Sequence, residues 1–387
     1  MNVQEPKATT DVLQVRGLKV DFHTYAGDVK ALDGVELIVK KGELLGLVGE
    51  SGCGKTVTAL SIMGLLPPNA EVLEGEVLLS GVDLLKMSKE EMRKTRLKDV
   101  AIVFQDPLTY LNPVLTVGSQ IEEIIDSQPN LFTSAIVKSR LKEVAAAEAE
   151  GRGGPELTTE KKRLQSVAGK WERLSGQERG RLTRNYIFAI MREVRLPEPE
   201  KVFRSFPFEL SGGMRQRVMI SMALVKRPKL LLADEMTTAL DVTVQAQILQ
   251  LIRELRSEID ASVVLITHDL AVVAETAHHV IVMYAGKKVE EADVEELFSA
   301  PLHPYTHGLL ASIPQLAVIG GDTVAAANGR LKEIPGMVPA LTNLPPGCSF
   351  APRCPFADDR CRSFYPPYEQ KRPGHWAACW HSERLYG

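Results

Sequence analysis

The sequence has few cysteines, a small net charge and no long hydrophobic run, and each of these features excludes a class of protein. Only 5 of the 387 residues are cysteine, too few for a disulfide-stabilised scaffold. No stretch approaches the roughly 18 consecutive apolar residues of a membrane-spanning helix, and the first residues lack the apolar core of a secretory signal. The formal net charge of −3 gives no global basic field for nucleic acid. We therefore expect an intracellular globular chain with no nucleic-acid partner.

The hydrophobic pattern predicts an α/β fold with added parts. Alternation over the first 45 residues predicts antiparallel strands with one solvated face, and residues 280–284 and 287–290 predict a hairpin. Short apolar runs at 44–48, 101–104, 230–233 and 263–267 are typical of buried parallel strands. Residues 57–66 predict a helix that Pro67 and Pro68 end.

Two further regions differ in composition from this core. Residues 116–225 are charged and helix-prone, which predicts a helical subdomain with an enlarged, polar insertion at about 129–185; for 145–165 a flexible surface excursion is an open alternative. After about residue 301, proline, glycine, aromatic residues and cysteine increase. We expect one domain over 1–300 and a small C-terminal extension over 301–387.

Residues 49–56 read GESGCGKT, between a predicted strand and a predicted helix, and match the P-loop pattern G-x-x-x-x-G-K-[ST]. Backbone N–H groups of such a loop face phosphate oxygens, and the helix N-terminus adds positive potential. In this pattern Lys55 reaches the β- and γ-phosphates and the Thr56 hydroxyl binds Mg²⁺. The predicted nucleotide-binding residues are Gly49, Glu50, Ser51, Gly52, Cys53, Gly54, Lys55 and Thr56.

A pair of acids supports the same site. Asp234 and Glu235 follow the apolar run 230–233, and an acid at the end of a buried parallel strand lies beside the P-loop in this kind of fold. We expect Asp234 to hold Mg²⁺ and Glu235 to polarise the attacking water as the catalytic base.

Between these elements stands LSGGMRQR, which resembles the signature motif of ABC ATPases. The resemblance implies that this segment closes over the nucleotide of a partner subunit in a head-to-tail dimer. The residues implied to contact the partner's ATP are Leu210, Ser211, Gly212, Gly213 and Met214.

Other positions match the same family in order. Gln105 resembles the Q-loop glutamine that contacts Mg²⁺ and nucleotide, Asp241 belongs to a D-loop-like ALD, and His268 in ITHDL resembles the catalytic switch histidine. Tyr25 is the candidate for stacking on adenine, with ordinary surface or strand packing as its alternative. Met236 and Thr238 replace the usual proline and serine of this motif, which leaves the phosphate and metal ligands unchanged.

Longer segments narrow the resemblance to the dipeptide, oligopeptide and nickel importers. They are FQDPLTYLNPVLTVGSQI, ALDVTVQAQIL, HPYT and PPGCSFAPRCPFADDRC. This branch implies a peripheral ATPase subunit at the cytoplasmic face of the membrane that powers uptake of short peptides or related solutes. Its implied partners are a second ATPase subunit, two transmembrane permease subunits and, indirectly, an external solute-binding protein.

Four cysteines, Cys348, Cys354, Cys361 and Cys379, form a separate group with spacings x5, x6 and x17. Structural zinc more often shows a C-x2-C knuckle, and irregular spacing favours an iron–sulfur cluster. Zinc and unliganded thiols stay open, and members of the resembled branch with a similar extension are associated with a [4Fe–4S] cluster. We expect His375 and His381 to be surface residues.

Two other function classes are open to this sequence. A soluble ABC ATPase of the repair or translation type usually has two cassettes or a long coiled coil, and this chain shows one cassette and no such coil. A metal-sensing regulator needs a DNA-binding element, and we find none in the sequence.

Overall fold

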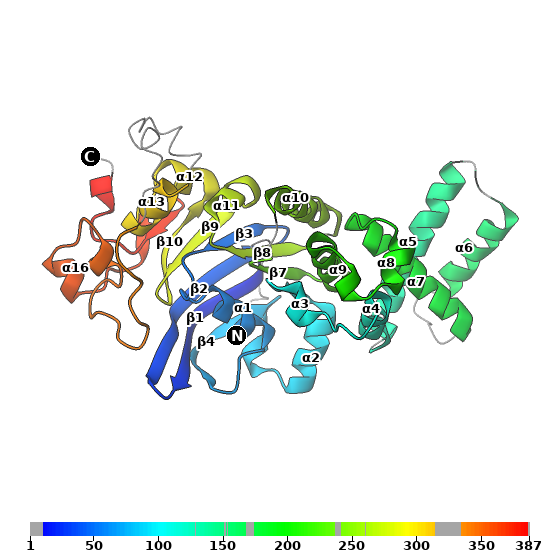
Figure 1. Cartoon of the computed structure of the whole chain (residues 1–387), viewed down its shortest axis with the longest axis horizontal. Coiled ribbons are helices and arrows are strands. Elements are labelled where there is room, and N and C mark those ends of the chain that lie inside the picture. The colour runs from blue at the N-terminus through cyan, green and yellow to red at the C-terminus, as the bar shows by residue number, and fades with distance from the viewer. Residues whose placement is uncertain are drawn as a thin grey trace, which may run out of the picture. The chain divides into compact units, whose positions relative to one another are not determined.

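A computed structural model describes residues 11–127, 129–150, 152, 154–167, 174–236, 241–259, 261–313 and 334–385. The chain forms two compact units, and β7 (Leu230–Asp234) has residues in both. The first unit falls within Met1–Met92, Leu232–Glu235 and Asp260–Gly387, and the second within Arg93–Leu231 and Met236–Ile259. Figure 1 labels the elements for which there is room, in the numbering used below.

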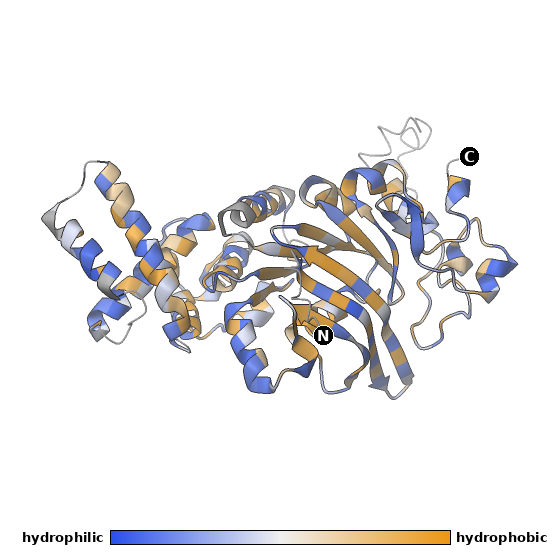
Figure 2. Ribbon diagram, turned by 180° about the vertical axis from the view of Figure 1, so that it is seen from behind, coloured by the Kyte–Doolittle hydropathy of each residue, from blue (hydrophilic) through white to orange (hydrophobic). Residues whose placement is uncertain are grey.

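The first unit begins with an antiparallel sheet of order β2-β1-β4-β5. Its strands are β1 (Asp11–Thr24), β2 (Gly27–Lys40), β4 (Ala70–Leu79) and β5 (Val82–Asp83), followed by the short 3-10 helix η1 (Leu84–Lys86). The register pairs Leu13 with Val39 and Val15 with Leu37, and all four side chains are buried. Buried and accessible positions alternate along these strands, as Figure 2 shows by the orange and blue residues along the long hairpin. The predicted sheet with one solvated face is confirmed.

The larger sheet has the strand order β11-β12-β10-β9-β3-β8-β7-β6. Its central strands β3 (Leu44–Val48), β8 (Ser262–Thr267) and β9 (His279–Tyr284) are parallel to one another, and β10 (Lys287–Asp293) forms the predicted hairpin with β9. All residues of β3, β7 and β8 are buried, which explains their continuous apolar sequence. The predicted strand at 101–104 is observed as β6 (Val100–Val103), which ends before Phe104.

Helix α1 (Lys55–Met63) follows β3 through the P-loop and ends earlier than predicted. Its C-cap is Gly64, whose φ of 58° lies in the left-handed region, where its N–H can reach the carbonyls of the last turn. The expectation that Pro67 and Pro68 end this helix was therefore wrong, since a glycine cap stops it first.

The C-terminal region belongs to the first unit and shares a hydrophobic core with β9 and β10. Tyr284, Tyr305 and Phe350 form an aromatic cluster with ring centroids 4.7 to 5.5 Å apart. Strand β12 (His375–Ala377) pairs with β10 and with β11 (Glu369–Arg372). The remaining elements of this region and of the β8–β10 segment are α11 (Leu270–Thr276), α12 (Val294–Ser299), α13 (Pro304–Ala311), η4 (Ala351–Arg353), α16 (Asp359–Ser363) and η5 (Ser382–Leu385).

The second unit is mainly helical, as predicted for residues 116–225. Its helices are α4 (Val117–Asp126), α5 (Pro129–Ala149), α6 (Pro155–Val167), α7 (Gly176–Glu193), α8 (Pro199–Arg204), η3 (Pro207–Glu209), α9 (Gly212–Leu224) and α10 (Val242–Ile259), preceded by α3 (Pro107–Tyr110) and most of α2 (Lys89–Lys98). Within the stretch 145–165, residues 145–149 belong to α5 and residues 155–165 belong to α6.

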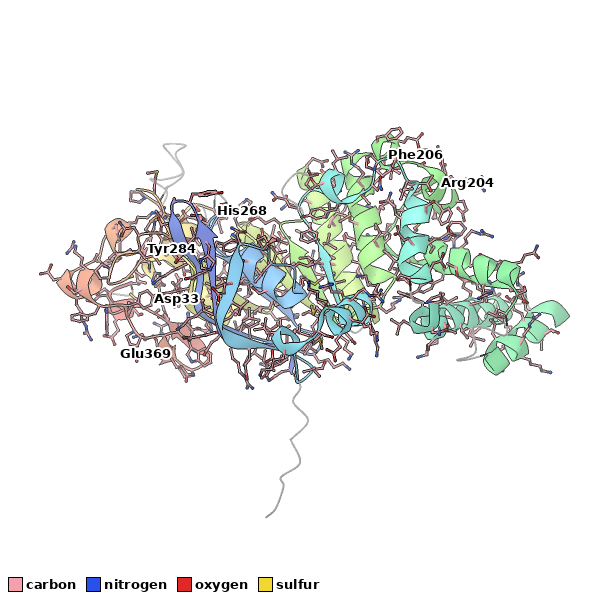
Figure 3. The ribbon with its side chains drawn as sticks, turned by 90° about the horizontal axis from the view of Figure 1, so that it is seen from below. Asp33, Arg204, Phe206, His268, Tyr284 and Glu369 are labelled. Atoms are coloured by element: carbon pink, nitrogen blue, oxygen red, sulfur yellow. The ribbon has the colours of Figure 1, made fainter. Side chains whose placement is uncertain are left out.

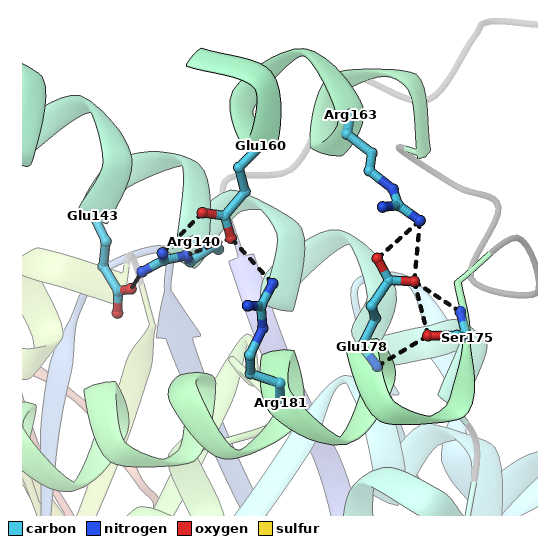
Figure 4. A network of polar contacts seen from close by, with 7 residues as sticks. All are labelled: Arg140, Glu143, Glu160, Arg163, Ser175, Glu178 and Arg181. Carbon is cyan, nitrogen blue, oxygen red and sulfur yellow. Dashed lines mark hydrogen bonds and ion pairs between the residues drawn. The ribbon is translucent and has the colours of Figure 1, made fainter. Parts of the chain in front are cut away.

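Charged residues explain how the polar insertion forms ordered helices. Arg140 of α5 donates to both carboxylate oxygens of Glu160 on α6 at 3.1 and 3.0 Å, and also to Glu143 at 2.7 Å (Figure 4). Ser175 and Glu178 form a capping box at the start of α7. These ion pairs and this cap stabilise helices in a segment that the sequence showed to be polar.

Candidate functional site

The P-loop joins the end of β3 to the start of α1, and its backbone geometry requires glycine at two positions. Gly49 has φ of 152°, and a Cβ there would lie 2.3 Å from the carbonyl oxygen of Met283. Gly54 has φ of 107°, and a Cβ there would lie 2.8 Å from the carbonyl oxygen of Ala31. The sequence spacing therefore reflects close packing of the loop against two neighbouring strands.

Lys55 is the first residue of α1, and its ammonium group lies within the loop. The side chain is 4% exposed and donates to the carbonyl oxygens of Gly49 at 2.7 Å and of Glu50 at 3.1 Å. Its Nζ is also 3.7 Å from Oε1 of Glu235. The loop thus holds a buried cation beside the backbone amides that the P-loop pattern directs at phosphate.

Thr56 and Asp234 bring together two oxygen ligands at the end of the parallel strands. The Thr56 hydroxyl is 3.3 Å from Oδ1 of Asp234. Burial is the main reason that the pKa of Asp234 is raised to about 6, and the nearby Glu235 carboxylate raises it further. A hydroxyl and a carboxylate are ligands that Mg²⁺ accepts, and a cation at this point would offset the burial of the carboxylate charge.

Glu235 follows β7 and lies between Lys55 and His268. Its Oε1 atom is 3.5 Å from Nδ1 of His268, and its backbone N–H donates to the carbonyl of Ile266 at 2.9 Å. Its φ of 44° is unusual for a residue with a Cβ and costs about 1 to 2 kcal/mol. His268, labelled in Figure 3, follows β8 and is about half exposed. The neighbouring strands β7 and β8 therefore place the predicted acid and histidine next to each other.

The signature segment lies in the second unit at the start of α9. Ser211 is the N-cap, and its Oγ accepts from the N–H of Met214 at 3.4 Å. A Cβ on Gly213 would lie 2.8 Å from Cγ1 of Val244 on α10, so glycine is required there for helix packing. Arg215 donates to the carbonyl of Leu210 at 2.6 Å and fixes the approach to the helix. Ser211 is exposed, and Gly212, Gly213 and Met214 are partly exposed.

The remaining predicted residues lie at the surface. Gln105 is exposed in the second unit, and Asp241 caps α10 by accepting from the N–H of Val244 at 3.0 Å. Residues 239 and 240 of the D-loop, and Thr238, lie outside the described residues. Tyr25 is fully exposed in the turn between β1 and β2. Its role in adenine stacking stays a prediction.

The four C-terminal cysteines line one pocket in the first unit. Cys348, Cys354, Cys361 and Cys379 surround it together with His303, Phe350, Trp380 and His381. Burial raises the pKa of Cys348 to about 12 and that of Cys354 to about 11, so these thiols are protonated at neutral pH unless a cation binds them. The four cysteines, although irregularly spaced in the sequence, therefore line one site in the fold.

Two histidines of this region, which we expected at the surface, are more buried than predicted. His375 is completely buried, and its Nε2 is 2.7 Å from Oε1 of the equally buried Glu290. His381 is partly buried and bonds to Asp358 at 2.7 Å. Because His375 lies on β12, which pairs with β10, its burial follows from a sheet contact that sequence spacing does not reveal. Asp358, Cys361 and His381 place one ligand atom each within 4.8 Å of one another.

Comparison with known proteins decides the family. The family model described as ABC transporter matches residues 32–238, and the model described as oligopeptide/dipeptide transporter, C-terminal region, matches residues 289–361. A probable peptide ABC transporter ATP-binding protein of Sinorhizobium fredii is 44% identical over 98% of this chain and 97% of its own length. The chain belongs to the ABC transporter family.

Further relatives and solved structures agree with this assignment. The dipeptide transport ATP-binding protein DppD of Bacillus subtilis is 41% identical over 95% of this ABC ATPase and 94% of its own length. A bacterial ABC transporter cassette solved as a dimer matches with a TM-score of 0.54 and 26% identity, covering 73% of this chain and 98% of that one. The same cassette in a post-hydrolysis state with ADP and phosphate gives the same TM-score at 25% identity. This chain is an ATPase with the ABC cassette fold.

No helix among the described residues of this ABC ATPase is both long and apolar enough to cross a bilayer.

The sequence did not reveal two residues that contact the P-loop. Arg353 and Tyr305 of the C-terminal region both bond to Glu50. Because 303 positions separate Glu50 from Arg353, no local pattern could have predicted the pair.

Proposed function

We propose that this ABC ATPase powers the uptake of short peptides or related solutes through separate transmembrane permease subunits. The support is its identity of 40 to 44% with proteins named as peptide, dipeptide and oligopeptide transport ATP-binding proteins. The match of residues 289–361 to an oligopeptide/dipeptide transporter C-terminal region adds to it. These relatives favour transport over the soluble repair or translation class.

The observation that carries the catalytic proposal is the grouping of Lys55, Thr56, Asp234, Glu235 and His268 where the strands β3, β7 and β8 end. We assign the amides of residues 49–56 and the Lys55 ammonium to the triphosphate. Thr56 and Asp234 would hold Mg²⁺, which on binding neutralises charge on the phosphate oxygens. Glu235 orients and polarises the attacking water, and His268 holds the Glu235 carboxylate from its other side.

We further propose that two ATPase chains close head to tail, so that residues 210–214 of one face the ATP bound by the other. The support is the exposed N-cap Ser211 with its two glycines at the start of α9, a geometry suited to an anion. Gln105 and Asp241 would then signal between the nucleotide site and the neighbouring subunits. We also keep, as a separate proposal, a domain over residues 1–300 and a C-terminal extension over residues 301–387.

The partners proposed are a second ATPase chain, two permease subunits that hold this chain at the cytoplasmic face of the membrane, and an external solute-binding protein. Co-expression with the permeases followed by membrane fractionation tests this. We expect the chain in the membrane fraction only when the permeases are present, and ATP hydrolysis by the reconstituted complex that short peptides with their binding protein stimulate. A chain that stays in the supernatant in both cases would refute the transport role.

For the thiol-lined pocket we propose a [4Fe–4S] cluster held by Cys348, Cys354, Cys361 and Cys379, with zinc or free thiols as competing outcomes. Four cysteines around one pocket fit such a ligand set. Anaerobic purification should yield iron and acid-labile sulfide in equal amounts. Cys361→Ser should lower both, while Cys53→Ser, which changes the one cysteine outside the group, should not. Zinc alone, or no metal, would overturn the proposal.

A further inference from the structure

The C-terminal region contacts the P-loop at a single residue, Glu50, from two directions. Arg353 donates from Nη1 to Oε2 of Glu50 at 2.7 Å and from Nη2 to Oε1 at 3.0 Å. Tyr305 accepts, through its hydroxyl, the backbone N–H of Glu50 at 2.8 Å. The side chain and the amide of Glu50 are therefore both held by residues more than 250 positions away in the chain.

Arg353 is itself fixed on every side. Its side chain is only 4% exposed, and its Nε and Nη2 donate to the carbonyls of Pro335 at 3.0 Å and Ile334 at 3.3 Å. The guanidinium also lies 5.9 Å from the ring centroids of Tyr284, which Figure 3 labels, and Phe350. A planar fork with two parallel bonds to a carboxylate sets orientation as well as distance, which a flexible ammonium group does not.

Tyr305 is equally constrained, because the start of α13 is anchored in the core. The backbone N–H groups of Leu302 and His303 both donate to the carboxylate of Glu290, which is fully buried and bonded to His375. His303 then caps the helix by accepting from the N–H of Tyr305 at 3.1 Å. The Tyr305 ring is completely buried. Its hydroxyl is thus presented to the P-loop by a rigid support.

The two carbonyl oxygens that orient Lys55 belong to Gly49 and Glu50. Any shift of residue 50 therefore moves the acceptors of the Lys55 ammonium. We propose that Arg353 and Tyr305 are positioning residues for ATP binding, which hold the first turn of the P-loop so that Lys55 meets the phosphates correctly. The inference deepens the proposed function and rests on its nucleotide site. It makes the C-terminal region a structural part of that site.

The experiment measures the Kd for MgATP of the full chain, with KM and kcat for hydrolysis, in Arg353→Gln, Glu50→Gln and the double variant. Because Glu50 and Arg353 act through one contact, we expect each single change to weaken ATP binding on the order of tenfold. The double variant should be no weaker than the single ones. In Arg353→Gln, which changes a residue outside the P-loop, the kcat at saturating ATP should stay within about twofold, because the catalytic groups are retained.

Two further variants separate positioning from stability. Tyr305→Phe keeps the ring in the aromatic cluster and removes only the hydroxyl, and should raise the Kd with little change in thermal unfolding. Arg353→Lys keeps one charged contact and should restore part of the affinity. Arg362→Gln is the matched control, because Arg362 forms an exposed ion pair with Asp359 away from the P-loop, and it should leave the Kd unchanged.

Unaltered ATP affinity in Glu50→Gln and Tyr305→Phe would overturn the inference, as would additive effects of Glu50→Gln and Arg353→Gln. If Arg353→Gln fails to fold, Glu50→Gln and Tyr305→Phe still decide the question. Failure of the unsubstituted chain to bind MgATP would instead refute the proposed nucleotide site.

Discussion

Replacement of Glu235 by Gln tests the assigned catalytic base with the smallest change of shape. Gln has the size of Glu and carries a Cβ, so the left-handed backbone at φ of 44° is strained equally in both proteins. The substitution removes the charge that lies 3.7 Å from Lys55 Nζ and 3.5 Å from His268 Nδ1. Thr56, Asp234 and the loop amides are untouched, so ATP binding should be retained.

The size of the effect follows from the role. A positioned general base contributes about 10² to 10⁴ in rate, which corresponds to about 2.7 to 5.4 kcal/mol in the activation free energy. We therefore expect kcat for ATP hydrolysis to fall at least about 100-fold. Loss of the negative charge beside Lys55 also removes a competitor for that ammonium group, so the Kd for MgATP should stay equal or decrease.

The assay compares steady-state phosphate release with equilibrium binding of MgATP. Glu275→Gln serves as control, because Glu275 is an exposed carboxylate on α11 of the same unit, and it should retain the original turnover. A Glu235→Gln protein that hydrolyses ATP at near-normal rate would refute the assignment. So would a protein that has lost ATP binding together with turnover, since the group would then hold the site together and have no specific part in the chemistry.

Three more outcomes follow from the site and its support. Burial raises the pKa of Asp234 to about 6, so its carboxylate is ionised above that pH. The affinity of the nucleotide-free protein for MgATP should therefore fall as the pH is lowered through about 6. Asp234→Asn should remove this pH dependence when binding is measured from about pH 5 to 8. Lys55→Ala should weaken MgATP binding by at least tenfold, because hydrogen bonds to charged groups are worth about 1.5 to 3 kcal/mol, and near-normal binding would contradict the assignment of this residue. Glu290→Gln should lower the free energy of unfolding by about 3 kcal/mol, because it breaks a buried pair with His375; a denaturant midpoint equal to that of the exposed control Glu369→Gln would contradict it.

Much of the fold could be predicted because its determinants are local. Continuous apolar runs gave β3, β7 and β8, and alternation gave the hairpin of β1 and β2. The P-loop pattern specified glycines whose backbone angles and close contacts the structure now explains at Gly49 and Gly54. The end of α1 was harder to predict, because glycine and proline can both end a helix, and here Gly64 ends α1 before Pro67 is reached.

The helical insertion was only half predicted because its stability is not visible as an apolar stripe. Arg140 of α5 contacts Glu160 of α6, Arg163 of α6 contacts Glu178 of α7, and Ser175 with Glu178 caps the start of α7 (Figure 4). The contacts between helices depend on which helix faces reach one another. A polar segment that forms these contacts has much the same composition as one that does not, so composition alone could not predict the ordered helices.

The sequence by itself determined the chemistry of this protein: a phosphate loop, two acids and a histidine after buried strands, a signature motif and four cysteines, each recognisable because spacing along the chain fixes its local geometry. Only the tertiary structure decided which distant residues meet. Neighbouring strands of one sheet brought Glu235 to His268, a buried sheet contact placed His375 against Glu290, and the folded C-terminal region placed Arg353 against Glu50. Contacts of this kind depend on how whole elements pack, and sequence separation carries no record of them.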